Sequence, residues 1–248
     1  MNIITWNVRE LNSPIRLSLL QHYLSSLRHS NLVVCLQETK ISGFFLHVLT
    51  KSFARNFHYS CTSADGTRGG LVTLISRDWR LAAHFSLPGG RANICTISKC
   101  GFSFNVVNVY APNFPLARSD LWNAISLSNS FPLIIAGDFN MYLHSLNGSN
   151  RIFFAERLTW TGLVDGFNCS DAIVLCNSPR LHTWSNGRLP PSIRLQDLID
   201  SIYRIMATRL VFLLVLLSPL SRSLTTFWSI FSSCFTLPRL PNAIMFTS

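Results

Sequence analysis

The stretch "LIIAGDFNM" closes an apolar run with two polar groups that could act together. Asp138 and Asn140 are two residues apart, so on an extended chain both side chains point to the same side and Phe139 points to the other. Gly137 lets the backbone bend just before them. A carboxylate can bind a hard cation, and an amide can donate to a phosphate oxygen. The pattern therefore predicts a polar site at the end of a buried strand.

Other apolar runs also deliver polar groups where they stop. Asn7 lies in "IITWNV" and Glu38 in "LVVCLQETK". Tyr110 and Asn113 lie in "VVNVYAPN". Because ligands of layered α/β folds collect at strand ends, these groups are expected to converge with those of "GDFN". Such a set offers carboxylates for a cation and amides or a phenol for phosphate oxygens.

Each residue also has an ordinary structural explanation. Asn7 fits a turn, Glu38 fits a solvent-facing position after a strand, and Tyr110 fits a core aromatic whose hydroxyl is bonded locally. The stretch "GDFN" is harder to explain in this way. The order of the stretches along the chain, more than any single residue, favours a functional site.

The segments between these groups must form the scaffold. Short runs rich in branched residues and closed by polar or turn residues predict strands at 2–8, 31–38, 69–76, 93–99, 102–112 and 131–139. Apolar residues at helical spacing predict helices within 13–30, 118–130 and 153–167. Successive strands with few long helices favour two packed sheets flanked by helices, which is an α/β fold.

Composition narrows the class of protein. The 248 residues are enough for one large domain, and the net charge of +10 favours an acidic partner such as nucleic acid or an anionic membrane. Seven cysteines without a CxxC pair argue against a zinc site and a secreted disulfide framework. The N-terminus has no secretory signal pattern. The apolar run Leu210–Leu220 is too short to span a bilayer and contains a proline, so no stable membrane insertion is expected.

The stretches "TWNVRELNSP", "VCLQETK", "RGGLVTLI", "VVNVYAPN", "IIAGDFNM" and "LHTWSNGR" resemble the endonuclease/exonuclease/phosphatase superfamily. They are most similar to the apurinic-type endonuclease domain of plant non-LTR (LINE-type) retrotransposons. The resemblance covers residues 1–189 and implies a four-layer α/β/β/α sandwich of two mixed sheets, incomplete at its C-terminal end. Glu10 is a departure, because that group has glycine there, and it puts an acid near the phosphate-binding cleft.

The resemblance implies Mg²⁺-dependent cleavage of a DNA phosphodiester, with Mn²⁺ as the alternative ion, no small-molecule cofactor, and an intracellular, nuclear location. Glu38 would hold the metal, and Asn7 would help to position the metal or the water. Asp138 would orient and activate the attacking water, and Asn140 would bind the scissile phosphate. Tyr110 would donate to a phosphate oxygen.

Substrate-binding residues are also implied by the resemblance. Asn113 follows Tyr110 on the same segment, and Trp184 and Ser185 in "HTWSNGR" would lie on a loop near the DNA. Trp184 equally fits a core position.

Two further motifs of the family are absent. One resembles "SRLDRF" and supplies another active-site Asp, and the other resembles "SDH" and supplies an Asp-His pair. A permitted coding sequence for Leu195–Ser201, read two bases out of phase, spells Ser-Arg-Leu-Asp-Arg-Phe. The same phase through Ser223–Thr226 spells Ser-Asp-His. We therefore interpret residues 190–248 as an out-of-frame tail, with a divergent but genuine C-terminal segment as the alternative.

This interpretation predicts an ancestral Mg²⁺-dependent DNA endonuclease that is inactive or strongly impaired. A working endonuclease would need an Asp and a His from elsewhere. A non-catalytic, basic nucleic-acid-binding remnant is an alternative. A phosphoesterase acting on a phospholipid headgroup is a further alternative. The stretches "WNVRELNSP" and "TWSNGR" disfavour it.

Overall fold

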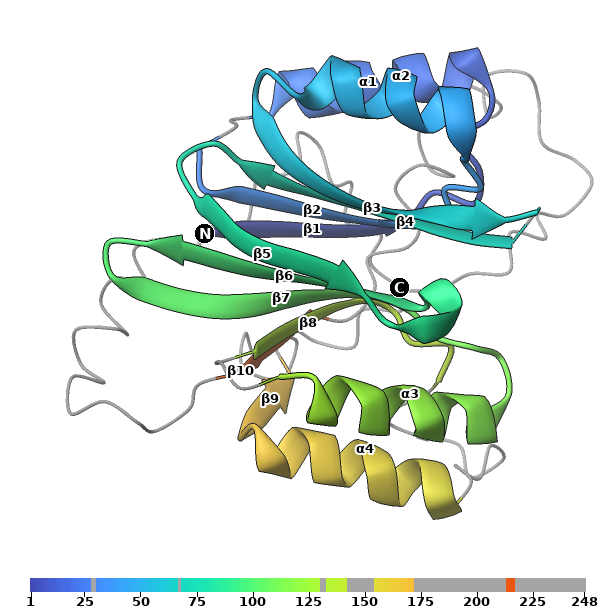
Figure 1. The fold of residues 1–248 in the computed structure, drawn as a ribbon, viewed down its shortest axis with the longest axis vertical. Coiled ribbons are helices and arrows are strands. Elements are labelled where there is room, and N and C mark those ends of the chain that lie inside the picture. Colours follow the sequence, from blue (N-terminus) through green and yellow to red (C-terminus); the bar gives the residue numbers. More distant parts are fainter. Residues whose placement is uncertain (28–29, 67, 130–132, 142–153, 172–212, 217–248) are drawn as a thin grey trace, which may run out of the picture.

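The computed structural model describes residues 1–27, 30–66, 68–129, 133–141, 154–171 and 213–216. Two β-sheets pack face to face, and helices cover the outer face of each sheet (Figure 1). Helices α1 (Pro14–Ser26) and α2 (Gly43–Phe53) lie on one outer face, and α3 (Pro115–Leu127) and α4 (Phe154–Gly166) lie on the other. The predicted four-layer α/β/β/α sandwich of two mixed sheets is confirmed.

The first sheet has four strands in the order β1-β2-β4-β3. Strands β1 and β2 are parallel, whereas β4 is antiparallel to both of its neighbours. Parallel strands need a crossover connection, and α1 provides it on the outer face of the sheet. The strands are β1 (Asn2–Asn7), β2 (Leu32–Gln37), β3 (Phe57–Asp65) and β4 (Arg68–Ser76).

The second sheet has six strands in the order β5-β6-β7-β8-β10-β9. Strands β7 and β8 are parallel and are joined through α3, and the other pairs are antiparallel. The ends of β1, β2, β7 and β8 are where the predicted site residues stand. The strands are β5 (Arg80–Ser86), β6 (Ala92–Lys99), β7 (Phe102–Tyr110), β8 (Leu133–Asp138), β9 (Cys169–Asp171) and β10 (Leu213–Leu216).

Three of the four helices found within the described residues were predicted. Pro14 and Pro115 occupy the first helical positions of α1 and α3, where a missing N–H costs nothing. The rings of Trp122 on α3 and Trp160 on α4 meet edge to face, with centroids 5.0 Å apart, and hold these helices together. The helices are α1 (Pro14–Ser26), α2 (Gly43–Phe53), α3 (Pro115–Leu127) and α4 (Phe154–Gly166), and a 3₁₀ turn covers Pro88–Gly90.

The sequence patterns do not predict α2, β3, β5, β9 and β10. Strand β5 is a sheet edge whose residues are mostly exposed, so no apolar alternation marks it. Strand β3 is the other long edge and mixes buried with exposed residues. The start of α2 has no side-chain capping hydrogen bond from Ser42, so the usual start signal is weak.

Strand β10 falls within the segment interpreted as an out-of-frame tail. It pairs antiparallel with β8 on one side and β9 on the other. The remaining tail, 190–212 and 217–248, lies outside the described residues, and the boundary at residue 189 stays a prediction. Within the described part of the chain, no helix has the length and apolarity needed to cross a bilayer.

The space between the two sheets changes character along the strands. At one end it is filled by buried apolar side chains, which we call the apolar end. Its members come from both sheets: Met1, Val33, Cys35, Ile75, Cys95, Ile97, Val106, Ile134 and Ala136. Because side chains alternate along a strand, residues two positions further on face the same space. There the side chains are polar.

Buried polar side chains form a row across the sandwich, which we call the polar row: Thr5, Gln37, Ser60, Thr73, Asn93 and Asn108. Gln37 Nε2 donates to Asn108 Oδ1 at 2.7 Å, and Thr73 Oγ1 donates to Asn93 Oδ1 at 3.0 Å. Each of these bonds joins the first sheet to the second. The polar row lies directly behind the strand ends that carry the predicted site.

Candidate active site

The side-chain amide of Asn7 joins the two carboxylates of the predicted site. Its Nδ2 atom donates to Glu38 Oε1 at 2.8 Å and to Asp138 Oδ2 at 2.7 Å. Its Oδ1 atom accepts the backbone N–H of Arg9 at 3.0 Å. Because carboxylate oxygens accept, these partners fix the orientation of the amide. Asn7 ends β1 and Glu38 directly follows β2 in the first sheet, whereas Asp138 ends β8 in the second, so the site spans the sandwich.

The backbone is unusual where the site residues leave their strands. Glu38 has a φ of 51° and Asn140 a φ of 47°, both in the left-handed region. Glutamate rarely adopts this conformation, and such residues concentrate at functional sites. The turn after Glu38 is anchored by the N–H of Thr39, which donates to the carbonyl of Gly70 at 3.1 Å. A Cβ at Gly70 would lie 2.5 Å from Thr39 Oγ1, so glycine permits this close approach.

Gly137 brings β8 unusually close to β7. A Cβ atom at this position would lie 2.0 Å from the carbonyl oxygen of Val109, which no side chain can tolerate. The next residue, Asp138, is the register partner of Tyr110 in the parallel β7–β8 pair. The glycine therefore allows the approach that places a carboxylate beside a phenol.

Tyr110 is held as a protonated hydrogen-bond donor. Burial, followed by the charge of the Glu38 carboxylate and its hydrogen bond, raises the pKa of Tyr110 to about 12. The Arg91 guanidinium carbon lies 5.1 Å from the centroid of the ring and opposes this rise in pKa. The carbonyl of Arg91 also accepts the backbone N–H of Tyr110 at 2.9 Å. At neutral pH the phenol can therefore donate to an anion.

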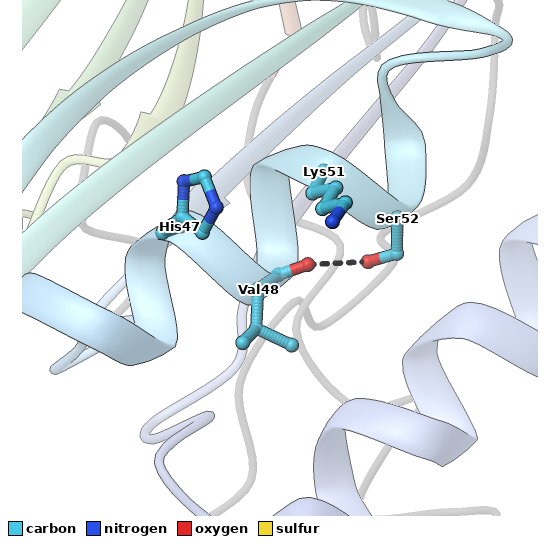
Figure 2. Close-up of a pocket in the computed structure, with 4 residues that line it drawn as sticks. All are labelled: His47, Val48, Lys51 and Ser52. Carbon is cyan, nitrogen blue, oxygen red and sulfur yellow. Dashed lines mark hydrogen bonds between the residues drawn. The ribbon is translucent and has the colours of Figure 1, made fainter.

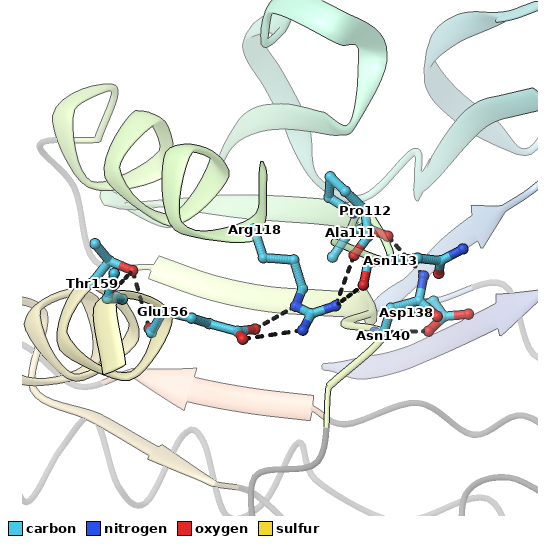
Figure 3. Close-up of polar contacts among 9 residues, drawn as sticks. Ala111, Pro112, Asn113, Arg118, Asp138, Asn140, Glu156 and Thr159 are labelled. Atoms are coloured by element: carbon cyan, nitrogen blue, oxygen red, sulfur yellow. Dashed lines mark hydrogen bonds and ion pairs between the residues drawn. The ribbon is translucent and has the colours of Figure 1, made fainter. Parts of the chain in front are cut away.

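Asn140 is fixed by the loop that follows β7. Its Nδ2 atom donates to the carbonyl of Ala111 at 2.7 Å, and its backbone N–H donates to Asp138 Oδ1 at 3.2 Å. Figure 3 shows Asn140 and Asp138 beside the segment that contains Ala111 and Asn113. The Asn113 residue is exposed, and its carbonyl accepts Arg118 Nη1 at 2.7 Å.

Basic residues surround the strand ends, although in the sequence they stand out only through the net charge. Arg9 follows Asn7 by two residues, Lys40 follows Glu38 by two, and Arg68 begins β4. With Arg91, they form what we call the basic rim. No ion pair of these residues is found within the described part of the chain. Their spacing from the strand-end residues is the signal that could have identified them.

A hollow on the outer helix α2 is separate from this site. It is lined by His47, Val48, Lys51 and Ser52 (Figure 2). The Ser52 hydroxyl donates to the carbonyl of Val48 at 2.9 Å, within the helix. None of the predicted site residues lines this hollow.

The structure brings together five of the predicted site residues. These residues are Asn7, Glu38, Tyr110, Asp138 and Asn140. Trp184 and Ser185 lie outside the described residues. The chemical roles assigned to the five residues stay predictions.

The donor set fits a hard divalent cation. Carboxylate and amide oxygens are the ligands that Mg²⁺ prefers, and this ion is commonly held by one or two carboxylates, with water and substrate phosphate completing its shell. Glu38 is half-buried at the edge of the site and suits this role. Among the described residues, no cluster of three or more His, Cys, Asp and Glu side chains could hold a metal alone.

Comparisons with known proteins agree with this fold. The chain belongs to the endonuclease/exonuclease/phosphatase family, whose model matches residues 4–209. An AP endonuclease from Archaeoglobus fulgidus has a similar structure, with a TM-score of 0.62 and 18% identity over 87% of each chain. The catalytic domain of Xenopus laevis APE2 gives a TM-score of 0.57 and 17% identity, over 86% of this chain and 82% of that one. No curated protein sequence matches the chain.

Proposed function

We propose that this chain derives from a Mg²⁺-dependent DNA endonuclease and hydrolyses phosphodiesters weakly as encoded. Family membership supports phosphoester hydrolysis as the ancestral chemistry. The observation that carries the proposal is the Asn7 amide, which joins Glu38 and Asp138 across two sheets at 2.8 and 2.7 Å. A structural role alone does not require two carboxylates to converge on one buried amide.

The proposed roles follow from the positions of the side chains. Glu38 would hold Mg²⁺, or Mn²⁺ in its place, and such an ion would supply charge neutralisation at the phosphate. Asp138, fixed by Asn7, accepts the proton of the attacking water. Tyr110, whose hydroxyl donates to the Glu38 carboxylate in this structure, redirects this hydrogen bond to a phosphate oxygen when substrate binds. Asn140 offers the phosphate its second amide hydrogen, because the first is committed to Ala111.

Weak hydrolysis is proposed because of the missing C-terminal motifs. The tail 190–248 contains no Asp-His pair at the place of "SDH" and no "SRLDRF". Loss of a histidine that moves protons typically lowers a rate by about 10²–10⁴-fold. The resemblance of residues 1–189 to LINE-type endonucleases supports a retroelement origin and access to nuclear DNA as part of the same proposal.

A second candidate function is DNA binding without hydrolysis. The basic rim of Arg9, Lys40, Arg68 and Arg91 favours it, because none of these cations forms an ion pair within the described residues. Binding through phosphate contacts releases counterions, so the affinity would fall steeply with salt. This candidate differs from the first in one respect, which is the absence of cleavage.

Nicking of supercoiled plasmid, followed with Mg²⁺, with Mn²⁺ and with EDTA, tests the proposal. We expect slow nicking by the wild type that requires the metal and is abolished in Asp138→Asn. Lys99→Met, which changes a cation on β6 that pairs with Asp78, is the control and should nick like the wild type. Salt-dependent binding without metal-dependent nicking would favour the second candidate.

The coding sequence across codons 185–230 tests the frameshift separately. The frameshift would be established if "SRLDRF" and "SDH" were both encoded in one reading frame, shifted by two bases from the frame of this chain. A protein with the frame restored should then nick faster by about 10²-fold or more. If these codons do not spell the motifs, the tail is genuine protein sequence and the frameshift is wrong.

A further inference from the structure

An ion pair between Arg118 on α3 and Glu156 on α4 is buried close to the site. Arg118 is 7% exposed and Glu156 is 1% exposed. The contact is bidentate: Arg118 Nε donates to Glu156 Oε1, and Arg118 Nη2 donates to Glu156 Oε2 at 3.1 Å. A planar guanidinium matches a carboxylate in this way, and a lysine cannot. Glu156 therefore holds the plane of the guanidinium in one orientation.

The same guanidinium reaches the loop that follows β7. Arg118 Nη1 donates to the carbonyls of Pro112 at 3.1 Å and Asn113 at 2.7 Å. Figure 3 shows the guanidinium between Glu156 on one side and these carbonyls on the other. One rigid side chain thus connects the first turn of α4 to the loop between β7 and α3.

That loop contacts the backbone of Asp138, the proposed catalytic residue, and the side chain of Asn140. The N–H of Ala111 donates to the backbone carbonyl of Asp138 at 2.8 Å. The carbonyl of Ala111 accepts Asn140 Nδ2 at 2.7 Å. Because the amide group of Asn140 is planar, its bond to Ala111 sets the direction of its second N–H. A shift of the loop would therefore misdirect the group offered to the phosphate.

Stability alone gives a weak reason for this ion pair. Replacing a buried ion pair with apolar residues of similar volume is often neutral or stabilising. The contact between α3 and α4 is already supplied by aromatic packing between Trp122 and Trp160. What the pair adds is a fixed geometry for the loop.

We propose that Arg118 and Glu156 are positioning residues that hold the loop at Ala111–Asn113, and through it Asn140, in the geometry required for phosphodiester cleavage. This inference rests on the proposed function. Neither residue touches the phosphate, and both act through the loop carbonyls. We expect the fold itself to be retained when both charges are replaced together.

Arg118→Lys is the first test, because it keeps the positive charge and loses the bidentate contact of the guanidinium with Glu156. At enzyme excess with Mn²⁺, the rate constant for plasmid nicking should fall by about 10–100-fold, because small misplacements are costly in rate. The Kd for the same DNA, from fluorescence anisotropy, should change by less than about 3-fold, since the basic rim is intact. Hydrogen exchange at the Ala111 amide should accelerate by about 10-fold.

The double variant Arg118→Met/Glu156→Met separates positioning from folding. It removes both charges together, so neither is left buried and unpaired. Its midpoint of urea unfolding should equal or exceed that of the wild type, while its nicking rate falls as in Arg118→Lys. Nicking and Ala111 exchange that match the wild type in this variant would overturn the proposal.

Lys99→Met is the matched control, since it breaks an ion pair with Asp78 outside the site. It should leave nicking, DNA affinity and Ala111 exchange unchanged. If the wild type itself shows no metal-dependent nicking, the proposed hydrolysis fails, and exchange at Ala111 alone decides the positioning role. Unchanged exchange in both Arg118 variants would then reject it.

Discussion

The two ends of the space between the sheets differ in chemistry although the same strands line both. At the apolar end, Val33, Cys35 and Val106 belong to one cluster of buried apolar side chains. At the polar row, Gln37 and Asn108 join the sheets through a 2.7 Å hydrogen bond. Apolar packing is non-directional, whereas hydrogen bonds fix distance and angle. The apolar end therefore holds the sheets together, and the polar row sets how they are aligned.

Alignment matters here because the site is divided between the sheets. Asn7 must meet Asp138 from the opposite sheet, and a slide of the sheets by a fraction of an ångström would lengthen their 2.7 Å bond. Buried polar networks are costly when partly satisfied and specify a single arrangement when complete. We infer that stability depends on both ends of this space, and that the geometry of the site depends on the polar row.

Gly137→Ala should have the largest effect, because it would disturb the pairing of β8 with β7 beside the site. The added Cβ would lie 2.0 Å from the Val109 carbonyl oxygen, so β8 must move away from β7. We expect a loss of about 3–5 kcal/mol in the free energy of unfolding, measured by urea denaturation. Gly162→Ala within α4 is the control, because its Cβ meets nothing within 4 Å, and it should stabilise by about 0.5–1 kcal/mol.

Asn108→Leu tests whether the polar row aligns the site. The substitution removes the partner of Gln37 and the donor that reaches Thr73 Oγ1 at 3.2 Å. Unpaired buried groups should lower the free energy of unfolding by about 1–3 kcal/mol, and plasmid nicking should fall as well. Asn105→Leu is the matched control, because Asn105 is buried on the same strand and bonds to Asn129.

The Asn105 variant should lose similar stability and keep the nicking rate of the wild type. Equal losses of nicking in the two variants, at equal stability, would mean that the polar row has no special role in alignment.

Ile97→Val tests whether packing at the apolar end affects the geometry of the site. Ile97 is fully buried between the sheets, and removing one methylene should cost about 0.5–1.5 kcal/mol in stability. Non-directional packing predicts that DNA affinity and nicking stay at the wild-type level. A change in either, with stability lowered by so little, would show that the apolar end also sets the alignment.

Glu10→Gly should have the smallest effect, and it acts outside the sandwich. Glu10 Oε2 lies 3.3 Å from Arg16 Nη1, and both side chains are partly exposed. Removing one negative charge near the basic rim should raise DNA affinity by about 2–5-fold at low salt, and the gain should vanish as salt screens the charge. Glu10→Gln separates charge from backbone freedom, and equal gains in the two variants would assign the effect to charge.

The sequence predicted the layers and the strand-end residues well, because alternation and chain order are local signals. It placed Asn7, Glu38, Tyr110, Asp138 and Asn140 at one site, and the structure brings them together. It assigned only a bend to the glycine before "DFN" and missed that this glycine lets β8 approach β7. The close approach to Val109 depends on a strand far away in sequence.

What the sequence could not reveal depends on contacts across the fold. Arg118 and Glu156 are ordinary charged residues on predicted helices, and only packing shows that both are buried. Gln37 and Asn108 stand beside predicted site residues, yet nothing local shows that they face each other. Edge strands β3 and β5 lack a full apolar pattern because only one side is paired.

Strand β10 shows which features of a protein chain can survive a shift of its reading frame. Its pairing with β8 and β9 uses backbone N–H and C=O groups, which almost every residue carries. A shifted reading frame that happens to spell branched apolar residues can therefore still supply a strand, whereas it has almost no chance of spelling an Asp-His pair. Under the proposed frameshift, the chain loses its catalytic residues before it loses its capacity to form strands. Part of the fold is therefore kept after the catalytic activity is lost.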